Sequence, residues 1–317
     1  MPKLSFLKED KVMKMKKLAA LALAAVMALG LVGCGGASIE GEGESESSDG
    51  GNGSIGLSVS TLSNPFFVTL AEGAEAKAEE MDAELIVVDA GDDAAKQTSD
   101  IEDLISKNIS VLIVNPVDSD AVAPAVETAI SKGIKVIAVD RVVNGVEVDC
   151  SIASDNVAGA EMATNYLVEL VGEGAEVAEL EGITGASATI DRGEGFHSVA
   201  DEKLNVVAKQ TASFDRAEGM SVMENILQAQ PNVKGVFAHN DEMALGALEA
   251  IGDKDIVVIG FDATDDALAS IAEGGMAATI AQQPDLMGAT AVETALKLIA
   301  GETVEKELPV EVKLVTE

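Results

Sequence analysis

Cysteine, histidine and aromatic residues are scarce in this chain of 317 residues. It has two Cys, two His, one Tyr and no Trp. The two histidines are His197 and His239, and the sequence holds no G-x-S-x-G, P-loop or H-E-x-x-H motif. These absences remove the usual signatures of a hydrolase, a nucleotide-binding enzyme and a zinc protease. We therefore expect no enzyme activity, no cofactor and no metal site.

Basic residues are also few, because 21 Lys and Arg stand against 55 Asp and Glu. The segment before Cys34 carries six Lys and two acidic residues, so its removal would change the net charge from −34 to −38. A protein of this sign repels the phosphate backbone of DNA and RNA. The composition excludes nucleic acid as a partner.

The N-terminus predicts export from the cytoplasm. A basic stub with three lysines precedes residues 18–33, which are sixteen apolar or small residues without a charge. This pattern is typical of a secretory signal peptide over residues 1–33 and is too short for a membrane span. The sequence leaves three start residues open: Met1, Met13 and Met15.

Leu31-Val-Gly-Cys34 ends the apolar segment and resembles the lipobox of bacterial lipoproteins, in which the Cys becomes the acylated first residue. The alternative is an ordinary signal peptide that contains a cysteine by chance. Residues 34–54 consist mainly of Gly, Ser and Glu and predict a flexible acidic tether. We expect a protein anchored by lipid at Cys34 on the extracytoplasmic face of the cell membrane. Cys150, the only other cysteine, should be buried and inert.

From residue 55 onward, short apolar runs alternate with longer amphipathic stretches, which is typical of parallel sheets covered by helices on both faces. The expected strands are 55–59, 84–88, 111–114, 136–139, 177–180, 206–209, 236–238, 256–259 and 277–280. The expected helices are 66–81, 94–107, 121–132, 157–171, 193–203, 217–229, 242–252, 265–274 and 286–300. Processing would leave 284 residues, which exceed a typical single core, so we predict two lobes.

Planar polar side chains follow the ends of six apolar runs. They are Asn64, Asn115, Asp140 with Arg141, Asn240 with Asp241, Asp262 and Gln282. Ligands of open parallel sheets bind outside the carboxyl ends of the strands, so these side chains predict a binding site. Helix capping is the alternative for Asn64, Asp118 or Ser119, Asp155, Asn240 or Asp241, and Thr264. Capping does not account for Arg141, Arg192 or Gln282.

Phenylalanines lie close to these polar residues in the sequence. Phe66 and Phe67 follow Asn64, and Phe214 precedes a second Asp-Arg pair. Phe237 and Phe261 also lie near strand ends, although they could be strand core. Planar amides, carboxylates and guanidinium groups suit hydroxyls, which both donate and accept, and phenyl rings suit the apolar faces of a sugar ring.

The charges of the candidate site are balanced. Asp140 and Asp262 match Arg141 and Arg192, so no cation is left over for a phosphate or a carboxylate. The residues therefore predict a site for a small neutral sugar.

Short motifs follow one another along residues 55–317. They are Ser60-Thr-Leu-Ser-Asn-Pro-Phe-Phe67, Asn115-Pro-Val-Asp-Ser-Asp120, Asp140-Arg141, Ile152-Ala-Ser-Asp-Asn156, Arg192-Gly-Glu-Gly-Phe196, Phe214-Asp-Arg216, Asn240-Asp-Glu-Met-Ala-Leu-Gly-Ala-Leu248, Gly260-Phe-Asp262 and Ala278-Thr-Ile-Ala-Gln282. In aggregate they make the chain similar to the D-ribose-binding proteins of bacterial ABC importers, within the periplasmic-binding-protein superfamily.

The resemblance implies an α/β fold with two Rossmann-like lobes. Each lobe would contain a parallel sheet, and a three-strand hinge would join them, as in periplasmic binding proteins of type I. The N-terminal lobe would comprise residues 55–154 plus 283–311, and the C-terminal lobe residues 155–282 plus 312–317.

The resemblance also implies which residues bind the sugar. Hydrogen bonds would come from Asn64, Asn115, Asp140, Arg141, Arg192, Asn240, Asp262 and Gln282. Phe66 and Phe67 would stack on one face of the sugar and Phe214 on the other. The chain departs from the family pattern at Ser63, where a second Asn is frequent, and at Ala263, which is usually Gly. Both departures could alter the fit at the rim of the site.

The expected protein is a monomer that captures D-ribose by lobe closure and delivers it to an ABC transporter permease. The ligand could instead be another small neutral sugar, namely allose, xylose or a furanosyl signalling molecule. The liganded form could also be recognised by a chemoreceptor. A sugar-responsive transcription repressor shares such a two-lobe core, but here a signal peptide and an acidic tether occupy the place of its DNA-binding segment.

Overall fold

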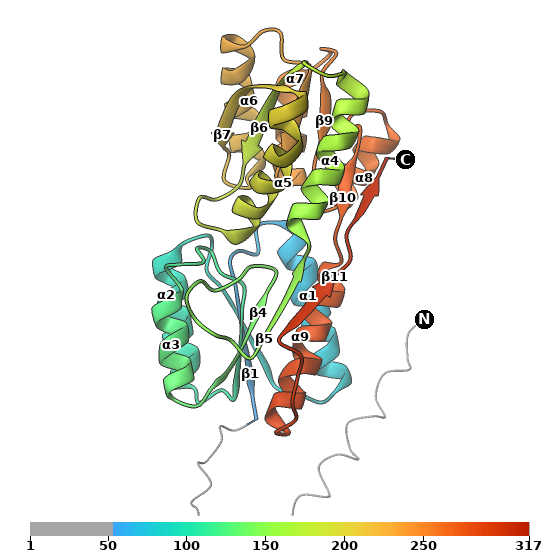
Figure 1. Ribbon diagram of the computed structural model, residues 1–317. Helices are drawn as coiled ribbons and strands as arrows, with labels where there is room; N and C mark the ends of the chain where they lie inside the picture. The colour runs from blue at the N-terminus through green and yellow to red at the C-terminus, as the bar shows by residue number, and fades with distance from the viewer. Residues whose placement is uncertain (1–52, 317) are drawn as a thin grey trace, which may run out of the picture. The chain divides into compact units, whose positions relative to one another are not determined.

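Strands and helices alternate along the chain from Ile55 onward, as the apolar pattern predicts. The computed structural model describes residues 53–316 (Figure 1). The predicted signal peptide, the predicted lipidation site Cys34 and nearly all of the predicted tether lie outside the described residues. Within residues 53–316, no helix has the length and apolar character that a membrane span requires.

The first sheet has six parallel strands in the order β11-β5-β4-β3-β1-β2. Its strands are β1 (Ile55–Val59), β2 (Leu85–Asp89), β3 (Val111–Val114), β4 (Lys135–Val139), β5 (Cys150–Ser154) and β11 (Glu307–Val310). One face is covered by α1 (Pro65–Glu80) and α9 (Pro284–Ile299), the other by α2 (Ala94–Ser106) and α3 (Ala123–Ser131) (Figure 1). We call this unit the N-terminal lobe.

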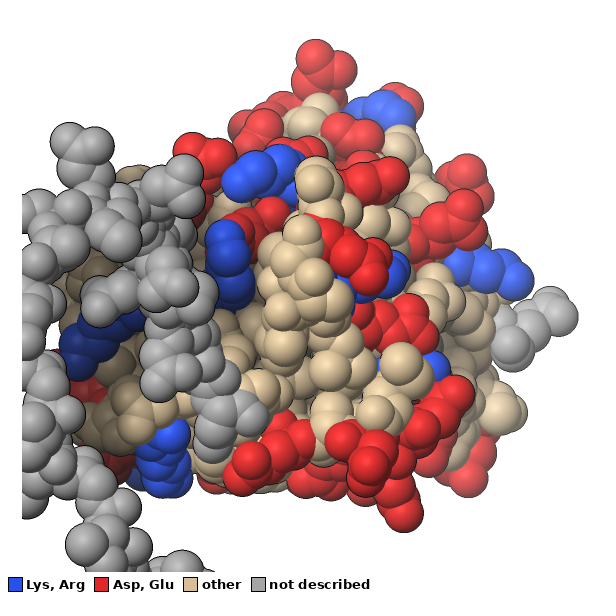
Figure 2. Space-filling view, turned by 90° about the horizontal axis from the view of Figure 1, so that it is seen from below, with Lys and Arg blue, Asp and Glu red and all other residues tan. Residues whose placement is uncertain are grey.

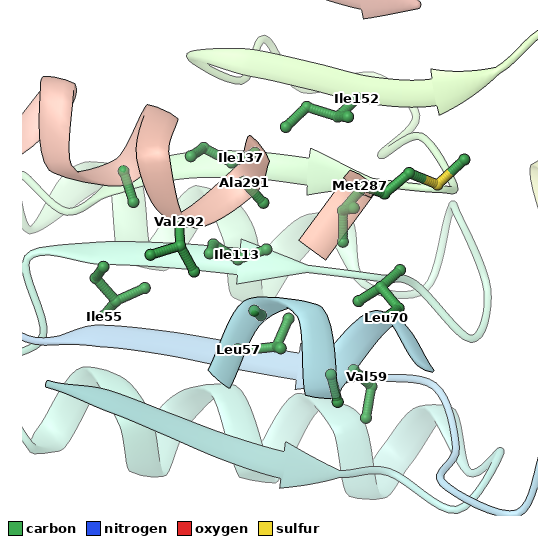
Figure 3. Packing of buried hydrophobic residues seen from close by; sticks show 14 of the residues in the cluster. Ile55, Leu57, Val59, Leu70, Ile113, Ile137, Ile152, Met287, Ala291 and Val292 are labelled. Atoms are coloured by element: carbon green, nitrogen blue, oxygen red, sulfur yellow. The ribbon is translucent and has the colours of Figure 1, made fainter. Parts of the chain in front are cut away.

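The interior strands β1, β3 and β4 of this lobe are largely apolar on both faces because helices cover both faces. On one face, Ile55, Leu57 and Val59 of β1 lie in one cluster with Leu70 of α1 and Val292 of α9 (Figure 3). All five side chains are fully buried. Burial of each such side chain contributes about 1.5–3 kcal/mol, so this packing holds α1 and α9 on the sheet.

The second sheet has four parallel strands in the order β7-β6-β8-β9, and a separate antiparallel pair joins β10 to β12. The strands are β6 (Glu176–Glu181), β7 (Asn205–Thr211), β8 (Gly235–Ala238), β9 (Val257–Ile259), β10 (Thr279–Ala281) and β12 (Lys313–Val315). The helices are α4 (Asn156–Val171), α5 (Ser187–Lys203), α6 (Arg216–Ala229), α7 (Asp241–Ile251) and α8 (Asp265–Ala272). We call this unit the C-terminal lobe.

The chain passes between the lobes three times. It does so at residues 154–156, between β5 and α4, at 281–284, between β10 and α9, and at 310–313, between β11 and β12. Helix α9 therefore packs in the N-terminal lobe, although it comes directly after strand β10 of the C-terminal lobe in the chain.

Two details differ from the expectations drawn from the sequence. Helix α5 begins at Ser187 and not at residue 193, so Arg192 lies within the helix. Gly195 lies inside this helix where it packs against α4, since a Cβ there would overlap the Val157 carbonyl oxygen. Strands β5, β11 and β12 come in addition to the nine expected. They lack a continuous apolar run, since their burial alternates or is only partial.

The charge of the surface follows the composition. The face seen in Figure 2 carries many acidic side chains and fewer basic ones. This agrees with the net charge of −34.

Glycines allow two helices in each lobe to cross very closely. A Cβ at Gly246 of α7 would overlap the carbonyl oxygen of Arg216 in α6, and a Cβ at Gly288 of α9 would overlap that of Leu70 in α1. Both contacts lie in the first two turns of the helices, so the N-terminal ends of each pair lie side by side. These ends carry several of the polar residues that the sequence singled out.

We predict that Gly246→Ala lowers the free energy of unfolding by about 1–3 kcal/mol, because the added methyl group must push α7 away from α6. Urea unfolding followed by circular dichroism measures this change. Gly193→Ala is the matched control, since its Cβ would meet Glu179 Oε1 at 3.6 Å, an ordinary contact, within helix α5. Equal stability of the two variants would contradict the proposed role of the close helix crossing.

Candidate functional site

A small cavity lies between the two lobes, beyond the carboxyl ends of the strands. Its lining residues are Asn64, Phe66, Phe67, Asp140, Arg141, Ala188, Arg192, Phe214, Asn240, Asp262 and Gln282. The structure thus brings together ten of the eleven residues that were singled out from the sequence. Ala188 was not predicted, because a single alanine carries no signal for binding. Asn115 does not line the cavity.

Asn115 lies behind Asp140 and holds it. Its Nδ2 donates to Asp140 Oδ2 at 3.0 Å and to the Val139 carbonyl at 3.2 Å, while its Oδ1 accepts from the Ser60 amide at 3.1 Å. Asp140 has a φ of 64°, a left-handed conformation that costs free energy in a residue other than glycine. The Asn115 amide therefore stabilises a strained residue at the cavity wall.

Gln97 holds the Asn115 segment in turn. Its Nε2 donates to the Asn115 carbonyl at 2.8 Å, and its Oε1 accepts from the Val117 amide at 2.8 Å. Sequence reasoning missed this residue. The sequence did contain a signal for it. Gln97 stands four residues before Ile101, which is the spacing of residues on one helix face, and this face of α2 is buried. Gln97 itself is only 1% exposed.

The Arg141 guanidinium lies between two phenyl rings from different lobes. Its Cζ is 5.1 Å from the centroid of Phe67 and 5.2 Å from that of Phe214, and its NH1 donates to the Pro116 carbonyl at 2.8 Å. Burial lowers the pKa of Arg141, and the charge of Asp140 opposes this shift. Cation–π contacts on both sides make this residue a contact between the lobes.

Arg192 is held on several sides within the C-terminal lobe. Its Nε donates to Asn156 Oδ1 at 2.9 Å, its NH1 donates to the His239 carbonyl, and Asp262 Oδ1 lies 3.8 Å from NH1. The guanidinium also lies 3.9 Å from the centroid of Phe261. Asn156 ends the motif Ile152-Ala-Ser-Asp-Asn156, but the sequence predicted no role for it. Its side chain positions Arg192.

Capping and lining of the cavity turn out to be compatible. Asn64 Oδ1 accepts from the Phe66 amide at 2.9 Å and caps α1, and Asn240 Oδ1 accepts from the Met243 amide at 3.0 Å and caps α7. Both asparagines also line the cavity. Asp155 and Thr264 cap α4 and α8 and do not line it.

Asp262 and Gln282 approach each other near the second crossing between the lobes. Gln282 Nε2 donates to Asp262 Oδ1 at 2.7 Å. Asp262 has a φ of 134°, Ala263 has 59° and Phe214 has 61°. Such conformations are uncommon outside glycine and concentrate at functional sites. The alanine at 263 therefore takes a conformation that the glycine common in the family would adopt more easily.

A third carboxylate changes the charge balance that the sequence suggested. Asp241 is fully buried behind Asp262, and its carboxylate accepts from Thr279 Oγ1 at 2.7 Å and from the Thr264 amide at 2.8 Å. Burial raises the pKa of Asp241 to about 6. Burial also raises the pKa of Asp262, an effect that Arg192 opposes and Asp241 reinforces. When Asp241 is ionised, it adds negative charge behind the cavity, which disfavours an anionic ligand.

Three side-chain atoms of lining residues make no hydrogen bond to any part of residues 53–316. They are Asp140 Oδ1, Arg141 Nε and Gln282 Oε1. Two are acceptors and one is a donor. A buried polar atom without a partner costs about 1–3 kcal/mol, so these atoms favour a ligand that donates and accepts within a short distance. Neighbouring hydroxyl groups do both.

The remaining predicted residues lie in the core. Cys150 is buried in β5, as expected. Phe237 and Phe261 are fully buried in the apolar cluster of the C-terminal lobe, which confirms the alternative that they are strand core. Across residues 53–316, no group of three His, Cys, Asp or Glu side chains could hold a metal ion.

Comparison with known proteins identifies similar proteins over most of the chain. The family model for the periplasmic binding protein domain matches residues 55–303. The ribose import binding protein of Bacillus subtilis is 53% identical over 266 residues, which are 83% of this chain and 87% of that protein.

Solved structures agree with this match. An ABC transporter solute binding protein from Bacillus halodurans with bound myo-inositol has a TM-score of 0.80 and 34% identity, and the match covers 84% of this chain and 96% of that one. A solute binding protein from Actinobacillus succinogenes with bound D-allose has a TM-score of 0.77 and 32% identity, covering 83% and 97%. These proteins are binding proteins, which supports the expectation that the chain is not an enzyme. The match of family, sequence and fold shows that the chain belongs to the periplasmic binding proteins, in their two-lobe type I form.

Proposed function

We propose that this protein binds D-ribose between its lobes and delivers it to an ABC permease. Asp140 Oδ1, Arg141 Nε and Gln282 Oε1, which make no hydrogen bond within residues 53–316, carry this proposal, because the hydroxyls of a sugar can satisfy all three. The 53% identity to a ribose import binding protein supports ribose in particular.

Another small neutral sugar is the second candidate. A similar protein binds D-allose and another binds myo-inositol, so the same two-lobe scaffold accepts rings of different stereochemistry. Allose, xylose and a furanosyl signalling molecule remain the alternatives to ribose. The proposed monomer could also present its liganded form to a chemoreceptor.

In the proposed complex, both lobes contact the sugar. Asp140 and Arg141 would bind hydroxyls from the N-terminal lobe, and Arg192 and Asp262 from the C-terminal lobe, with Asn64, Asn240 and Gln282 as the further polar groups. Phe66 and Phe67 would contact one face of the ring and Phe214 the other. Hydrogen bonds to charged groups contribute about 1.5–3 kcal/mol each, which is enough to favour a form in which both lobes engage one ligand.

Hydrogen bonds between the lobes support a mechanism of closure. The Ser119 amide donates to the Gly185 carbonyl at 3.0 Å, the Ser187 amide donates to Ser119 Oγ at 3.2 Å, and the Val142 amide donates to Ser187 Oγ at 3.1 Å. Separation of the lobes would break all three bonds. A sugar that binds only the closed form would shift the equilibrium toward it.

The proposed lobes are residues 55–154 plus 283–311 and residues 155–282 plus 312–317, which would rotate about the three crossings of the chain. Short connecting segments can absorb such a rotation, because few backbone dihedral angles need to change. The permease would recognise the surface that both lobes form after closure.

Ribose should stabilise the wild-type protein against heat more than other monosaccharides do.

Arg141→Ala should weaken ribose binding by about 10²–10³-fold, because it removes charged hydrogen bonds and leaves Asp140 buried without its partner. Isothermal titration calorimetry measures the affinity. Lys77→Ala is the control, since Lys77 is a cation that also pairs with two carboxylates, Glu80 and Glu293, and does not line the cavity. Preference for another sugar would select the second candidate, and absence of binding to any sugar would reject both.

Ser187→Ala should lower the affinity for ribose about 2- to 10-fold although Ser187 does not line the cavity, because the closed form loses the hydrogen bond from Val142. Small-angle X-ray scattering should show a more open sugar-free protein. Ser198→Ala on the same helix is the control, because Ser198 bonds within the C-terminal lobe only. An unchanged affinity for Ser187→Ala would argue against a role of these bonds in closure.

We further infer an anchor on the extracytoplasmic face of the cell membrane, through acylated Cys34. The basic stub, the apolar segment and the lipobox-like motif before Cys34 support it. Expression of the full chain with Cys34→Ala should move the protein from the membrane fraction to the soluble extracytoplasmic fraction and stop fatty-acid labelling. Labelling that persists in this variant would refute the anchor.

A further inference from the structure

A buried glutamate lies in an interior strand of the C-terminal lobe, beneath the cavity. Glu179 stands in β6, between β7 and β8, and its side chain is fully buried. Its Oε1 lies 3.0 Å from His239 Nε2, and its Oε2 lies 3.0 Å from His197 Nε2. The chain has only two histidines, and both contact this one carboxylate. We call Glu179, His197 and His239 the glutamate–histidine cluster.

One end of this cluster reaches the surface. The His197 ring is 28% exposed, and its Nδ1 lies 2.8 Å from Asp201 Oδ1. Lys209 of β7 lies 3.7 Å from Glu179 Oε2 and 3.0 Å from Glu181 Oε1. Protons can therefore exchange with solvent through His197.

The other end of the cluster reaches the proposed sugar site. The His239 carbonyl accepts a hydrogen bond from Arg192, and His239 directly precedes Asn240. Gly193, next to Arg192, lies close to the cluster, since a Cβ there would be in ordinary contact with Glu179 Oε1 at 3.6 Å and His239 Cε1 at 3.7 Å. The turn of α5 that carries Arg192 thus packs directly over the cluster.

Stability alone does not explain a buried charge at this position. Neighbouring residues on this side of the sheet include Phe196 and Phe237, whose rings stack at 5.4 Å and are fully buried. Replacement of buried ionic groups by apolar side chains of similar size is often neutral or stabilising. The cluster therefore has a role beyond packing.

The protonation states follow from the surroundings. Burial raises the pKa of Glu179, but the hydrogen bond from His239 and the charges of His197 and Lys209 outweigh it, so the pKa is lowered. Burial lowers the pKa of His239, although Glu179 opposes this. At neutral pH, His239 is uncharged and its Nε2 donates to an ionised Glu179. Its Nδ1 has no partner in the described part of the chain, and a proton there would add a cation near Arg192.

We propose that Glu179 is a positioning residue that acts through His239 to fix Arg192, and that proton uptake by the glutamate–histidine cluster weakens sugar binding. This inference rests on the proposed sugar-binding function. His239 accepts a proton less readily in the folded protein than in a free peptide, so sugar binding should be intact above pH 6.5 and decline as the pH falls below it. Asp241, with a pKa of about 6, titrates in the same range, so the shift of the decline in Glu179→Gln is the result that assigns it to the cluster.

The test is the variant Glu179→Gln. Its affinity for ribose, or for the monosaccharide that stabilises the wild-type protein most against heat, is measured by calorimetry from pH 5 to pH 8. We expect an affinity at least about tenfold lower at pH 7.5, because the His239 ring loses its charged partner and no longer holds in place the His239 carbonyl that accepts from Arg192. The decline in acid should also move to lower pH, because His239 loses the carboxylate that favours its protonation. Glu181→Gln, two residues further along β6 and also paired with Lys209, should behave like the wild-type protein.

A folded Glu179→Gln variant with wild-type affinity and a wild-type pH profile would overturn the inference. If this variant does not fold, the wild-type protein provides the test. Its two histidine rings can be followed separately by ¹⁵N NMR, and the sugar should shift the titration of His239 to lower pH by linkage. An unchanged titration would also overturn the inference. A wild-type protein that binds no sugar would instead reject the proposed function.

Discussion

The burial of two guanidinium groups between the lobes is the constraint on which the site depends. Arg141 and Arg192 are each 3% exposed, and a buried charge is tolerated only when it is paired and hydrogen-bonded. Each arginine therefore has a carboxylate and a backbone carbonyl of its own lobe as partners. Because these partners are present on each lobe separately, each half of the site is organised before the lobes meet.

The scaffold supports this arrangement through backbone geometry. Parallel strands end at one edge of each sheet, and the glycine-mediated crossing of helix pairs brings helix N-termini to the same edge. Left-handed conformations at Asp140, Phe214 and Asp262 then turn the chain sharply after the strands. The hydrogen bonds from Asn115 and Gln282 offset part of this strain.

Contacts between the two lobes close the cavity, in addition to the contacts that hold its residues within each lobe. The phenyl rings of Phe67 and Phe214 lie on opposite sides of Arg141 and come from different lobes. The hydrogen bonds of Ser119 and Ser187 also join the lobes. A ligand that bridges the two halves therefore adds to contacts that already favour the closed form. In such a system, affinity depends on the free energy of closure as well as on direct contacts.

The sequence by itself determined the fold class and most of the cavity wall, because local signals were strong. Continuous apolar runs marked buried parallel strands, and polar residues at their ends marked the edge where a ligand binds. The contacts of Gln97, Asn156 and Glu179 are visible only in the folded protein. Each is a polar residue inside a helix or strand whose partner lies far away in the chain. Such a residue resembles any other polar position until folding buries it, since burial and pairing are properties of the packed protein.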